Sequence, residues 1–401
     1  MSDVQVQTTP APALTPEDES TTTQMRAARL HHAGQPFSID TIAKPSPRPT
    51  EVVVRVKACG MVHNLINVLD PGVAGDTIRR PAVPAIYGLD AAGVIVETGS
   101  QVHGLHVGDR VYVNPLRYCG SCRSCRAGRV RACNRVALAG YIGCGPNSSE
   151  MLAEYPYGGY AEFMTAPQYG IVTLPDTVSF ETAARWGYLG TGYSALRRAK
   201  VNMSTTVLIN GISGTLGLGA ALFALALGAP MILGVGRDIK RLERVKALAP
   251  DRIHVMSTAE GASVDEWARS LTGGEGVDVV VDALPTGCSK GPFLAAAAAL
   301  GREGVHVNVG AVLEEVPLNV FRIMNDSQTF LGSFWFTTDE GQEMADLAAS
   351  GSINLNVFEH EVFGLEDINE ALAALTSDDR DGGFTNVVIS PDARSTPRRS
   401  H

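Results

Sequence analysis

Four cysteines between residues 119 and 133 have the spacing of a metal site, with two, two and seven residues between successive thiols. Short spacings let several thiolates point into one loop, and the longer return closes a tetrahedral shell, as in structural zinc sites. In an iron–sulfur motif the fourth cysteine follows after three residues and precedes a proline, whereas Asn134 follows here. A complete thiolate shell leaves no position for a substrate. We therefore predict one structural Zn²⁺, without a role in chemistry, held by Cys119, Cys122, Cys125 and Cys133.

A glycine-rich turn over residues 211–217 has the spacing of a phosphate site. It lies between an apolar strand predicted over residues 205–210 and an apolar helix predicted over residues 218–227, which is the context in which such a turn binds a pyrophosphate. Glycine lets the backbone approach the phosphates, and the helix N-terminus supplies amides and partial positive charge. The residues expected to contact the cofactor here are Gly211, Gly214, Thr215, Leu216 and Gly217.

The end of the next strand, predicted over residues 230–235, bears on the choice of cofactor. An NAD enzyme places Asp or Glu there to bind the ribose hydroxyls, but this chain has Gly236 followed by Arg237, with Lys240 nearby. A guanidinium in place of a carboxylate favours a 2′-phosphate, and therefore NADPH over NADH. Asp238 keeps NADH open as an alternative, because its carboxylate is able to turn toward a ribose or to neutralise Arg237.

The composition is that of a globular protein. The 401 residues, 45% hydrophobic and 19% charged, allow two or three domains. The net charge of −9 argues against a nucleic-acid partner. The longest uncharged apolar run, residues 216–233, is rich in Gly and Ala and contains Pro230, so we predict no membrane span. The singletons Cys59, Cys144 and Cys288 favour a reducing, cytoplasmic location over a disulfide framework.

Periodicity divides the chain into two kinds of structure. Short β-type runs separated by Gly and Pro, such as residues 51–57 and 110–113, predict a mostly antiparallel β domain. From about residue 189, apolar strands alternate with helices such as those expected over residues 238–248 and 293–300. This alternation predicts an α/β region with a doubly wound parallel sheet.

The remaining segments are assigned by their position and composition. Helices are expected over residues 340–350 and 365–375, and a strand over residues 387–389 is expected to return to the first domain. Residues 1–24 and 391–401 lack an apolar block and are predicted to be a disordered leader and tail.

Several further motifs occur along residues 25–390. They are VKACG at 56–60, PAIYGLDAAG at 84–93, VGDRV at 107–111, GGYAEF at 158–163 and TFLGS at 329–333. Together with the four cysteines and the glycine turn, they resemble the medium-chain dehydrogenases/reductases of the zinc alcohol dehydrogenase superfamily.

This resemblance implies a two-domain architecture. A GroES-like catalytic domain would comprise residues 25–188 and 335–390, with the zinc lobe at 119–133, and a Rossmann domain would comprise residues 189–334. The nicotinamide would meet a small-molecule substrate between the two domains. The resemblance also implies a homodimer formed through the edge of the Rossmann sheet.

At the family's catalytic zinc this chain departs from the pattern. The residues aligned with the three ligand positions are Val62, Leu89 and Gly187, and none has a side-chain lone pair. Zinc does not bind without its ligands. Residues 88–90 and 210–217 instead resemble the zinc-free quinone oxidoreductases and enoyl reductases. We therefore expect the structural zinc to be kept and the catalytic zinc to be lost.

Without a catalytic metal, side chains must handle the proton that accompanies hydride transfer. His63 and Asn64 follow the lost cysteine position, and a histidine donates or accepts a proton near neutral pH. Tyr188 lies next to the lost third position, and Asp90 is expected to orient His63 or to pair with an arginine. The resemblance places four further residues along the nicotinamide site: Thr191, Val309, Ser333 and Trp335.

Three functions follow from these patterns. The favoured one is an NADPH-dependent reductase of a polarised C=C, C=N or C=O bond, because conjugation in the substrate then supplies the polarisation that zinc otherwise provides. The second is an alcohol dehydrogenase whose metal ligand comes from an unexpected residue such as Cys59 or His63. The third is a protein that binds NADPH without turnover.

Overall fold

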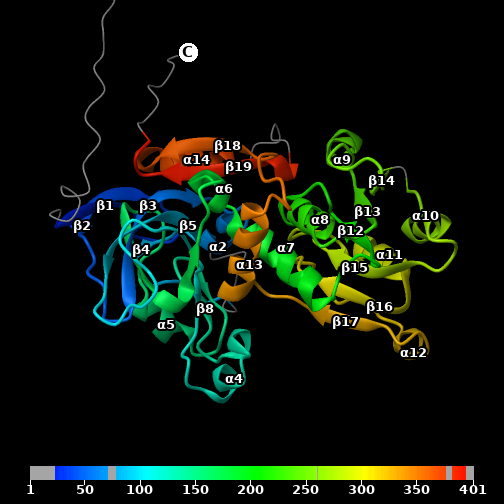
Figure 1. Cartoon of the computed structure of the whole chain (residues 1–401), viewed down its shortest axis with the longest axis horizontal. Helices are drawn as coiled ribbons and strands as arrows, with labels where there is room; N and C mark the ends of the chain where they lie inside the picture. The colour runs from blue at the N-terminus through cyan, green and yellow to red at the C-terminus, as the bar shows by residue number, and fades with distance from the viewer. Residues whose placement is uncertain (1–22, 71–77, 260, 376–381, 394–401) are drawn as a thin grey trace, which may run out of the picture.

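The computed structural model describes residues 23–70, 78–259, 261–375 and 382–393 of the chain (Figure 1). Most of the predicted leader and tail lies outside these residues. The described residues include parts of both predicted segments: Gln24 begins strand β1 (Gln24–Leu30), and Asp392 forms ion pairs with Arg55 at 3.0 Å and Lys57 at 2.8 Å. None of the helices in the described part of the chain has the length and apolar character needed to cross a bilayer.

The first part of the chain forms mostly antiparallel β sheets. Strands β3 (Glu51–Gly60) and β5 (Asp90–Thr98) are paired antiparallel at the centre of a seven-stranded sheet. Strand β19 (Thr385–Ser390) pairs with the end of β3, which confirms that the C-terminal strand returns to this sheet. The other strands of this part are β2 (Ser38–Ala43), β4 (Ala85–Ile86), β6 (Arg110–Val113), β7 (Leu116–Arg117), β8 (Ala137–Leu138), β9 (Ile142–Gly143), β10 (Phe163–Pro167), β11 (Ile171–Thr173) and β18 (Glu359–Gly364).

Helices surround these sheets and connect them to the rest of the chain. Helix α7 (Trp186–Arg198) lies between the β sheets and the second part of the molecule (Figure 1). The buried core is continuous across this junction, because one apolar cluster joins residues of β3 and β5 to residues of α7 and of the second part. The other helices of this part are α2 (Leu65–Leu69), α4 (Arg123–Arg126), α5 (Ser148–Glu154), α6 (Phe180–Ala183), α13 (Thr338–Ala349) and α14 (Ile368–Ala374), with short 3-10 turns at Val130–Ala132, Gln168–Gly170, Leu365–Asp367 and Gly382–Phe384.

The second part is a six-stranded parallel sheet. Its strands are β12 (Thr206–Asn210), β13 (Met231–Gly236), β14 (Ile253–Ser257), β15 (Val277–Asp282), β16 (Leu300–Asn308) and β17 (Thr329–Gly332). The spatial order β14-β13-β12-β15-β16-β17 is that of the Rossmann fold, in which the ligand lies where the strand order reverses. Here that point is at the carboxyl ends of β12 and β15. The prediction of a mostly antiparallel β domain and a doubly wound parallel sheet is confirmed.

The helices of the second part are α8 (Thr215–Ala226), α9 (Ile239–Lys246), α10 (Val264–Leu271), α11 (Lys290–Ala298) and α12 (Val320–Asn325). Three of them, α8, α9 and α11, overlap the helices predicted from the sequence, whereas α10 and α12 were not predicted. The prediction of a helix over residues 293–300 was wrong at its end, because Leu300 already belongs to β16 and pairs with Val277 of β15.

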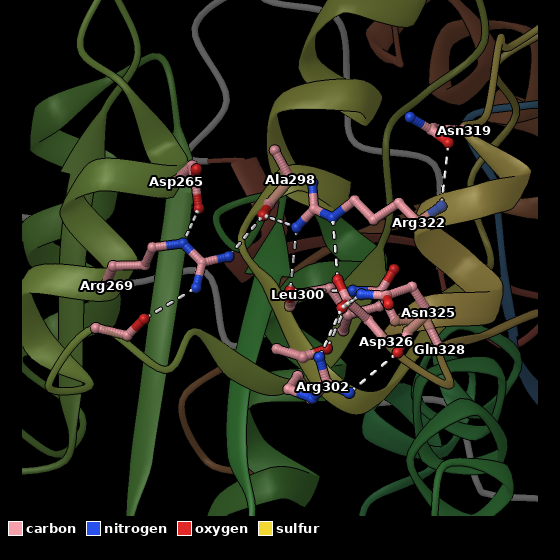
Figure 2. A network of polar contacts seen from close by, with 12 residues as sticks. Asp265, Arg269, Ala298, Leu300, Arg302, Asn319, Arg322, Asn325, Asp326 and Gln328 are labelled. Carbon is pink, nitrogen blue, oxygen red and sulfur yellow. Dashed lines mark hydrogen bonds and ion pairs between the residues drawn. The ribbon is translucent and has the colours of Figure 1, made fainter.

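Helix α12 is fixed against the sheet by arginines that bind backbone carbonyls. Arg322 of α12 donates to the Ala298 carbonyl at 2.9 Å and to the Leu300 carbonyl at 3.4 Å. Arg269 of α10 donates to the same Ala298 carbonyl at 3.2 Å (Figure 2). These contacts join the end of α11 and the start of β16 to helices α10 and α12.

Candidate functional site

The four cysteines of the predicted zinc lobe lie together on α4 and the loops that flank it. All four Sγ atoms lie within 4.8 Å of one another, and the Cys122–Cys125 and Cys119–Cys133 Sγ pairs are 3.5 and 3.6 Å apart. Zn–S bonds of about 2.3 Å in a tetrahedron require sulfur atoms roughly 3.8 Å apart. The residues present therefore fit a structural zinc ion, and they would hold it through all four thiolates.

Backbone amides favour the thiolate form of Cys119, whereas burial raises the pKa of the Cys125 and Cys133 thiols. The amides of Ser121 and Cys122 lower the pKa of Cys119 to about 6, and the Cys122 amide lies 3.4 Å from the Cys119 sulfur. The Arg135 amide lies 3.4 Å from the sulfur of Cys133. Donors aimed at sulfur favour the charged form, which is the form that binds metal.

The glycine turn has the geometry that a pyrophosphate requires. Gly211, at the end of β12, has a φ of 86°, in the left-handed region that favours glycine. Gly214 precedes α8 without a side-chain hydrogen bond to the helix amides, so no side chain competes with a phosphate for them. A Cβ on Gly217 would lie 2.1 Å from the Gly211 carbonyl oxygen. Thr215 and Leu216 begin the helix.

Basic side chains follow the end of β13, and the carboxylate of Asp238 there accepts hydrogen bonds from the start of the next helix. Arg237 and Lys240 are exposed beside Gly236. Asp238 caps α9 by accepting from the amides of Lys240 at 2.9 Å and Arg241 at 3.3 Å, and its second oxygen lies 3.5 Å from Nε of Arg241. The carboxylate thus stabilises the start of a helix and pairs with Arg241.

His63 and Tyr188 lie side by side, although they are far apart in the sequence. The backbone amide of His63 donates to the Tyr188 hydroxyl at 2.8 Å, and the two ring centroids are 6.5 Å apart in an edge-on arrangement. Burial is the largest influence on Tyr188 and raises its pKa, so the hydroxyl keeps its proton. Asn64 donates to the Tyr141 hydroxyl at 3.2 Å and accepts from Asn67 at 3.0 Å.

Asp90 is buried, and it does not orient His63 as expected. One carboxylate oxygen, Oδ1, accepts from the Tyr112 hydroxyl at 2.7 Å and from the Gly187 amide at 2.9 Å. The other, Oδ2, has no hydrogen-bond partner among the described residues. Arg185 acts on Asp90 through its charge alone. Burial outweighs these two hydrogen bonds and the nearby Arg185 charge, and it raises the pKa of Asp90 from 3.8 to about 7.

The raised pKa of Asp90 predicts a dependence of stability on pH. Because the folded state binds this proton more tightly than the unfolded state, stability falls as the pH rises from about 4 to about 7. Asp90→Asn removes this penalty. Between about pH 5 and about pH 8, the unfolding free energy of the variant relative to the wild type should increase by about 2 kcal/mol. Urea unfolding at both pH values checks this, and an equal difference at the two would contradict it.

The three positions where the resemblance implies catalytic zinc ligands carry no ligating side chain, and their surroundings are closely packed. Val62 and Leu89 are buried in the apolar core. A Cβ on Gly187 would lie 2.4 Å from Oδ1 of Asp90 and 2.5 Å from the ring of Trp335, so no ligating side chain fits at that position. In the described part of the chain, the four-cysteine lobe is the single group of three or more His, Cys, Asp or Glu residues able to hold a metal.

The other predicted cofactor residues lie at the carboxyl end of the parallel sheet or beside it. Thr191 of α7 is buried, and its hydroxyl donates to the Gly187 carbonyl at 2.8 Å. The Val309 amide donates to the Asp282 carbonyl at 2.9 Å. Ser333 is buried, and its hydroxyl has no hydrogen-bond partner within the described residues, which leaves it able to bind a ligand atom. Trp335 has a φ of 53° and is 9% exposed.

Sequence reasoning missed residues whose contacts shape the site. Tyr112 binds Asp90, Tyr141 binds Asn64, and Asn114 accepts from the indole nitrogen of Trp335 at 2.9 Å. Arg131, between the third and fourth cysteines, donates to the Trp335 carbonyl at 3.0 Å. Tyr112, Tyr141 and Asn114 belong to no recognisable sequence motif. The only signal for Arg131 was its place in a basic stretch of the metal loop.

Comparison with known proteins agrees with this geometry. The alcohol dehydrogenase GroES-like domain profile matches residues 48–176, and the zinc-binding dehydrogenase profile matches residues 215–350. The alcohol dehydrogenase of Geobacillus stearothermophilus is 33% identical over 371 residues, covering 92% of this chain and 100% of that protein. Sorbitol dehydrogenase of Bacillus subtilis is 28% identical over 350 residues, covering 87% of this chain and 92% of that protein.

Solved structures show the same arrangement. The structure of AibC has a TM-score of 0.80 at 27% identity, covering 96% of this chain and 100% of that one. The cobalt- and zinc-bound thermostable alcohol dehydrogenase from Pyrobaculum aerophilum has a TM-score of 0.73 at 26% identity, covering 92% and 100%. This chain therefore belongs to the zinc alcohol dehydrogenase superfamily of medium-chain dehydrogenases/reductases and is an NAD(P)-dependent oxidoreductase.

Proposed function

We propose that this chain is an NADPH-dependent reductase of a small organic substrate with a polarised C=C, C=N or C=O bond, and that it works without catalytic zinc. The observation that carries the proposal is the packing at Gly187, where a side chain would collide with Asp90 and Trp335. With Val62 and Leu89 also buried in the core, three positions that hold a metal in the family offer no ligand atom here. Polarisation of the substrate's double bond then has to come from conjugation within the substrate and from hydrogen bonds to the protein.

Bound NADPH would supply the hydride, and the protein would position the substrate and deliver a proton. Tyr188 is the proposed donor. Its oxygen accepts the His63 amide, while its own proton is not used in a hydrogen bond among the described residues. His63 is exposed beside it, and an imidazole in that position is able to return a proton from solvent. Asn64 would orient this segment through Tyr141.

A metal count combined with two variants tests the function. The purified chain should contain one zinc and oxidise NADPH with an enone, imine or aldehyde substrate. Tyr188→Phe should lower kcat by about 100-fold or more, because general acid catalysis contributes that much, while NADPH affinity stays within about twofold. His63→Ala should lower kcat less.

Tyr157→Phe, the same change at another partly buried tyrosine, is the matched control and should be neutral. Two zinc ions per chain would favour the alternative of an alcohol dehydrogenase with an atypical ligand such as Cys59 or His63. NADPH binding without oxidation by any such substrate would favour a nucleotide-binding protein without turnover.

The preference for NADPH over NADH is proposed from the end of β13. Arg237 and Lys240 are exposed there, and Asp238 is engaged by the amides of α9, which leaves positive charge to meet a 2′-phosphate. Arg237→Ala should raise the Kd for NADPH about tenfold and leave the Kd for NADH within about twofold. Titration of each cofactor by fluorescence checks this, and an equal loss for both would contradict the assignment.

A homodimer through the edge of the parallel sheet is also proposed. Strand β17 is the last strand of that sheet, and Val320, Phe321 and Met324 on the neighbouring α12 are 77%, 69% and 65% exposed. Large apolar side chains gathered beside an open strand edge are typical of a protein interface. Light scattering tests the proposal, because a mass equal to the single 42.4 kDa chain would contradict it.

A further inference from the structure

Arg131 connects the four-cysteine lobe to two distant segments of the chain. One guanidinium nitrogen donates to the Ser194 hydroxyl of α7 at 2.7 Å and to the Trp335 carbonyl at 3.0 Å. The other lies 3.3 Å from the Glu340 carboxylate of α13. Ser194 itself donates to Glu340 at 2.9 Å. Because the side chains of Arg131 and Glu340 are only 22% and 12% exposed, water screens this pair less than it screens a surface ion pair.

The residue that Arg131 holds has a backbone conformation that needs support. Trp335 has a φ of 53°, a left-handed conformation that costs a residue with a side chain roughly 1 kcal/mol or more. Such a conformation persists only where the surroundings enforce it. Two contacts do so here: Arg131 binds the carbonyl, and Asn114 accepts from the indole nitrogen at 2.9 Å.

The Trp335 ring borders the proposed reaction site. A Cβ on Gly187 would lie 2.5 Å from the ring and 2.6 Å from Oδ2 of Asp90, so ring, glycine and carboxylate are packed against one another. Thr191, one turn along α7, donates to the Gly187 carbonyl. A shift of the Trp335 backbone would therefore move a wall of the place where cofactor and substrate are proposed to meet.

The position of Arg131 in the lobe depends on the four thiolates. Arg131 lies at the centre of the 3-10 turn Val130–Ala132, which begins five residues after Cys125 and ends directly before Cys133. A metal bound by these cysteines would therefore restrain the turn on both sides. The other arginines of the loop, at positions 123, 126 and 129, have exposed side chains. Arg131 is thus the arginine that the lobe directs toward the junction of the two domains.

We propose that Arg131 is a positioning residue that couples metal binding in the four-cysteine lobe to the placement of Trp335. The lobe then does more than stabilise the fold, because its metal sets the geometry of a wall of the reaction site 204 residues away in sequence. The structural part of this proposal stands on the contacts of Arg131, and its effect on turnover rests on the proposed reductase function.

Fluorescence of Trp335 during zinc removal tests the coupling without any substrate. The chain has three tryptophans, so subtracting the spectrum of Trp335→Phe isolates the emission of Trp335. A chelator should shift that emission in the wild type and in Arg129→Met, which changes an exposed arginine of the same loop. In Arg131→Met the emission should already be shifted, and chelation should change it little. Arg131→Met with the wild-type emission, or with the wild-type response to chelation, overturns the proposal.

Kinetics then test the consequence for turnover. With one zinc still bound, Arg131→Met should lower kcat/KM about tenfold, because small misplacements of reacting groups are costly. Arg131→Lys should recover part of this loss, and Arg129→Met should stay within about twofold of the wild type. In a Trp335→Ala background Arg131→Met should cost less than about threefold, since the ring that it positions is gone. Equal losses in both backgrounds would mean that Arg131 acts only through general stability. If the wild type itself lacks reductase activity, the proposed function fails while the fluorescence result still decides the coupling.

Discussion

Gly217→Ala is expected to abolish NADPH binding at micromolar concentrations. The new Cβ would lie 2.1 Å from the Gly211 carbonyl oxygen and 2.7 Å from Cα of Ile212. Both atoms belong to the backbone of the turn, so no side-chain rotation relieves the collision. Overpacking of this kind costs about 1–3 kcal/mol, and the turn has to move away from the position that a pyrophosphate requires. The Kd for NADPH should rise at least about 100-fold.

A matched control separates loss of binding from loss of folding. Gly291→Ala makes the same change at the start of α11, where the nearest atom to a new Cβ is the Ser289 hydroxyl oxygen at 3.9 Å. That variant should bind NADPH as the wild type does. Calorimetric titration and thermal unfolding of both variants provide the measurement. A folded Gly217→Ala protein with unchanged NADPH affinity would show that residues 211–217 are not the phosphate site.

Cys133→Ser is expected to remove the zinc and to destabilise the chain by more than about 4 kcal/mol, since loss of a structural metal is among the largest single-residue effects. Cys133 is buried, and its sulfur lies 3.6 Å from that of Cys119. A serine hydroxyl is a poor replacement for a thiolate ligand.

Cys144→Ser is the control for this experiment, because Cys144 is exposed near the lobe and lies outside the cluster of four. Metal analysis should find one zinc per chain in the wild type and in Cys144→Ser, and none in Cys133→Ser. Thermal unfolding should place the transition of Cys133→Ser well below the other two. Full zinc content in Cys133→Ser would contradict the assignment of the ligands.

The local parts of the site followed from the sequence because their residues are close together along the chain. The cysteines lie within a single loop, and the glycine turn needs only the strand before it and the helix after it. In both cases spacing alone determines which atoms are able to meet. The alternation of strands and helices likewise predicted the parallel sheet, and the end of α11 was misplaced because alanine and leucine suit a helix as well as the start of a buried strand.

The environment of Asp90 is an example of what periodicity does not reveal. The sequence offered His63 or an arginine as its partner, but the fold placed Tyr112 and the Gly187 amide against it instead. These partners come from β6 and α7, and they meet Asp90 only when the β sheet and the helix pack together. The raised pKa of Asp90 follows from that packing, because burial is a property of the whole fold.

By itself, then, the amino-acid sequence determined the fold class, the four-cysteine lobe, the glycine turn and the family to which the chain belongs. Only the tertiary structure decided that His63 meets Tyr188, that Gly187 leaves no room for a ligating side chain, and that Arg131 reaches Trp335. The contacts with Tyr188 and Trp335 join residues 125 and 204 positions apart. Such contacts arise from the way in which the two sheets pack around α7, and the order of residues along the chain carries no local pattern for them.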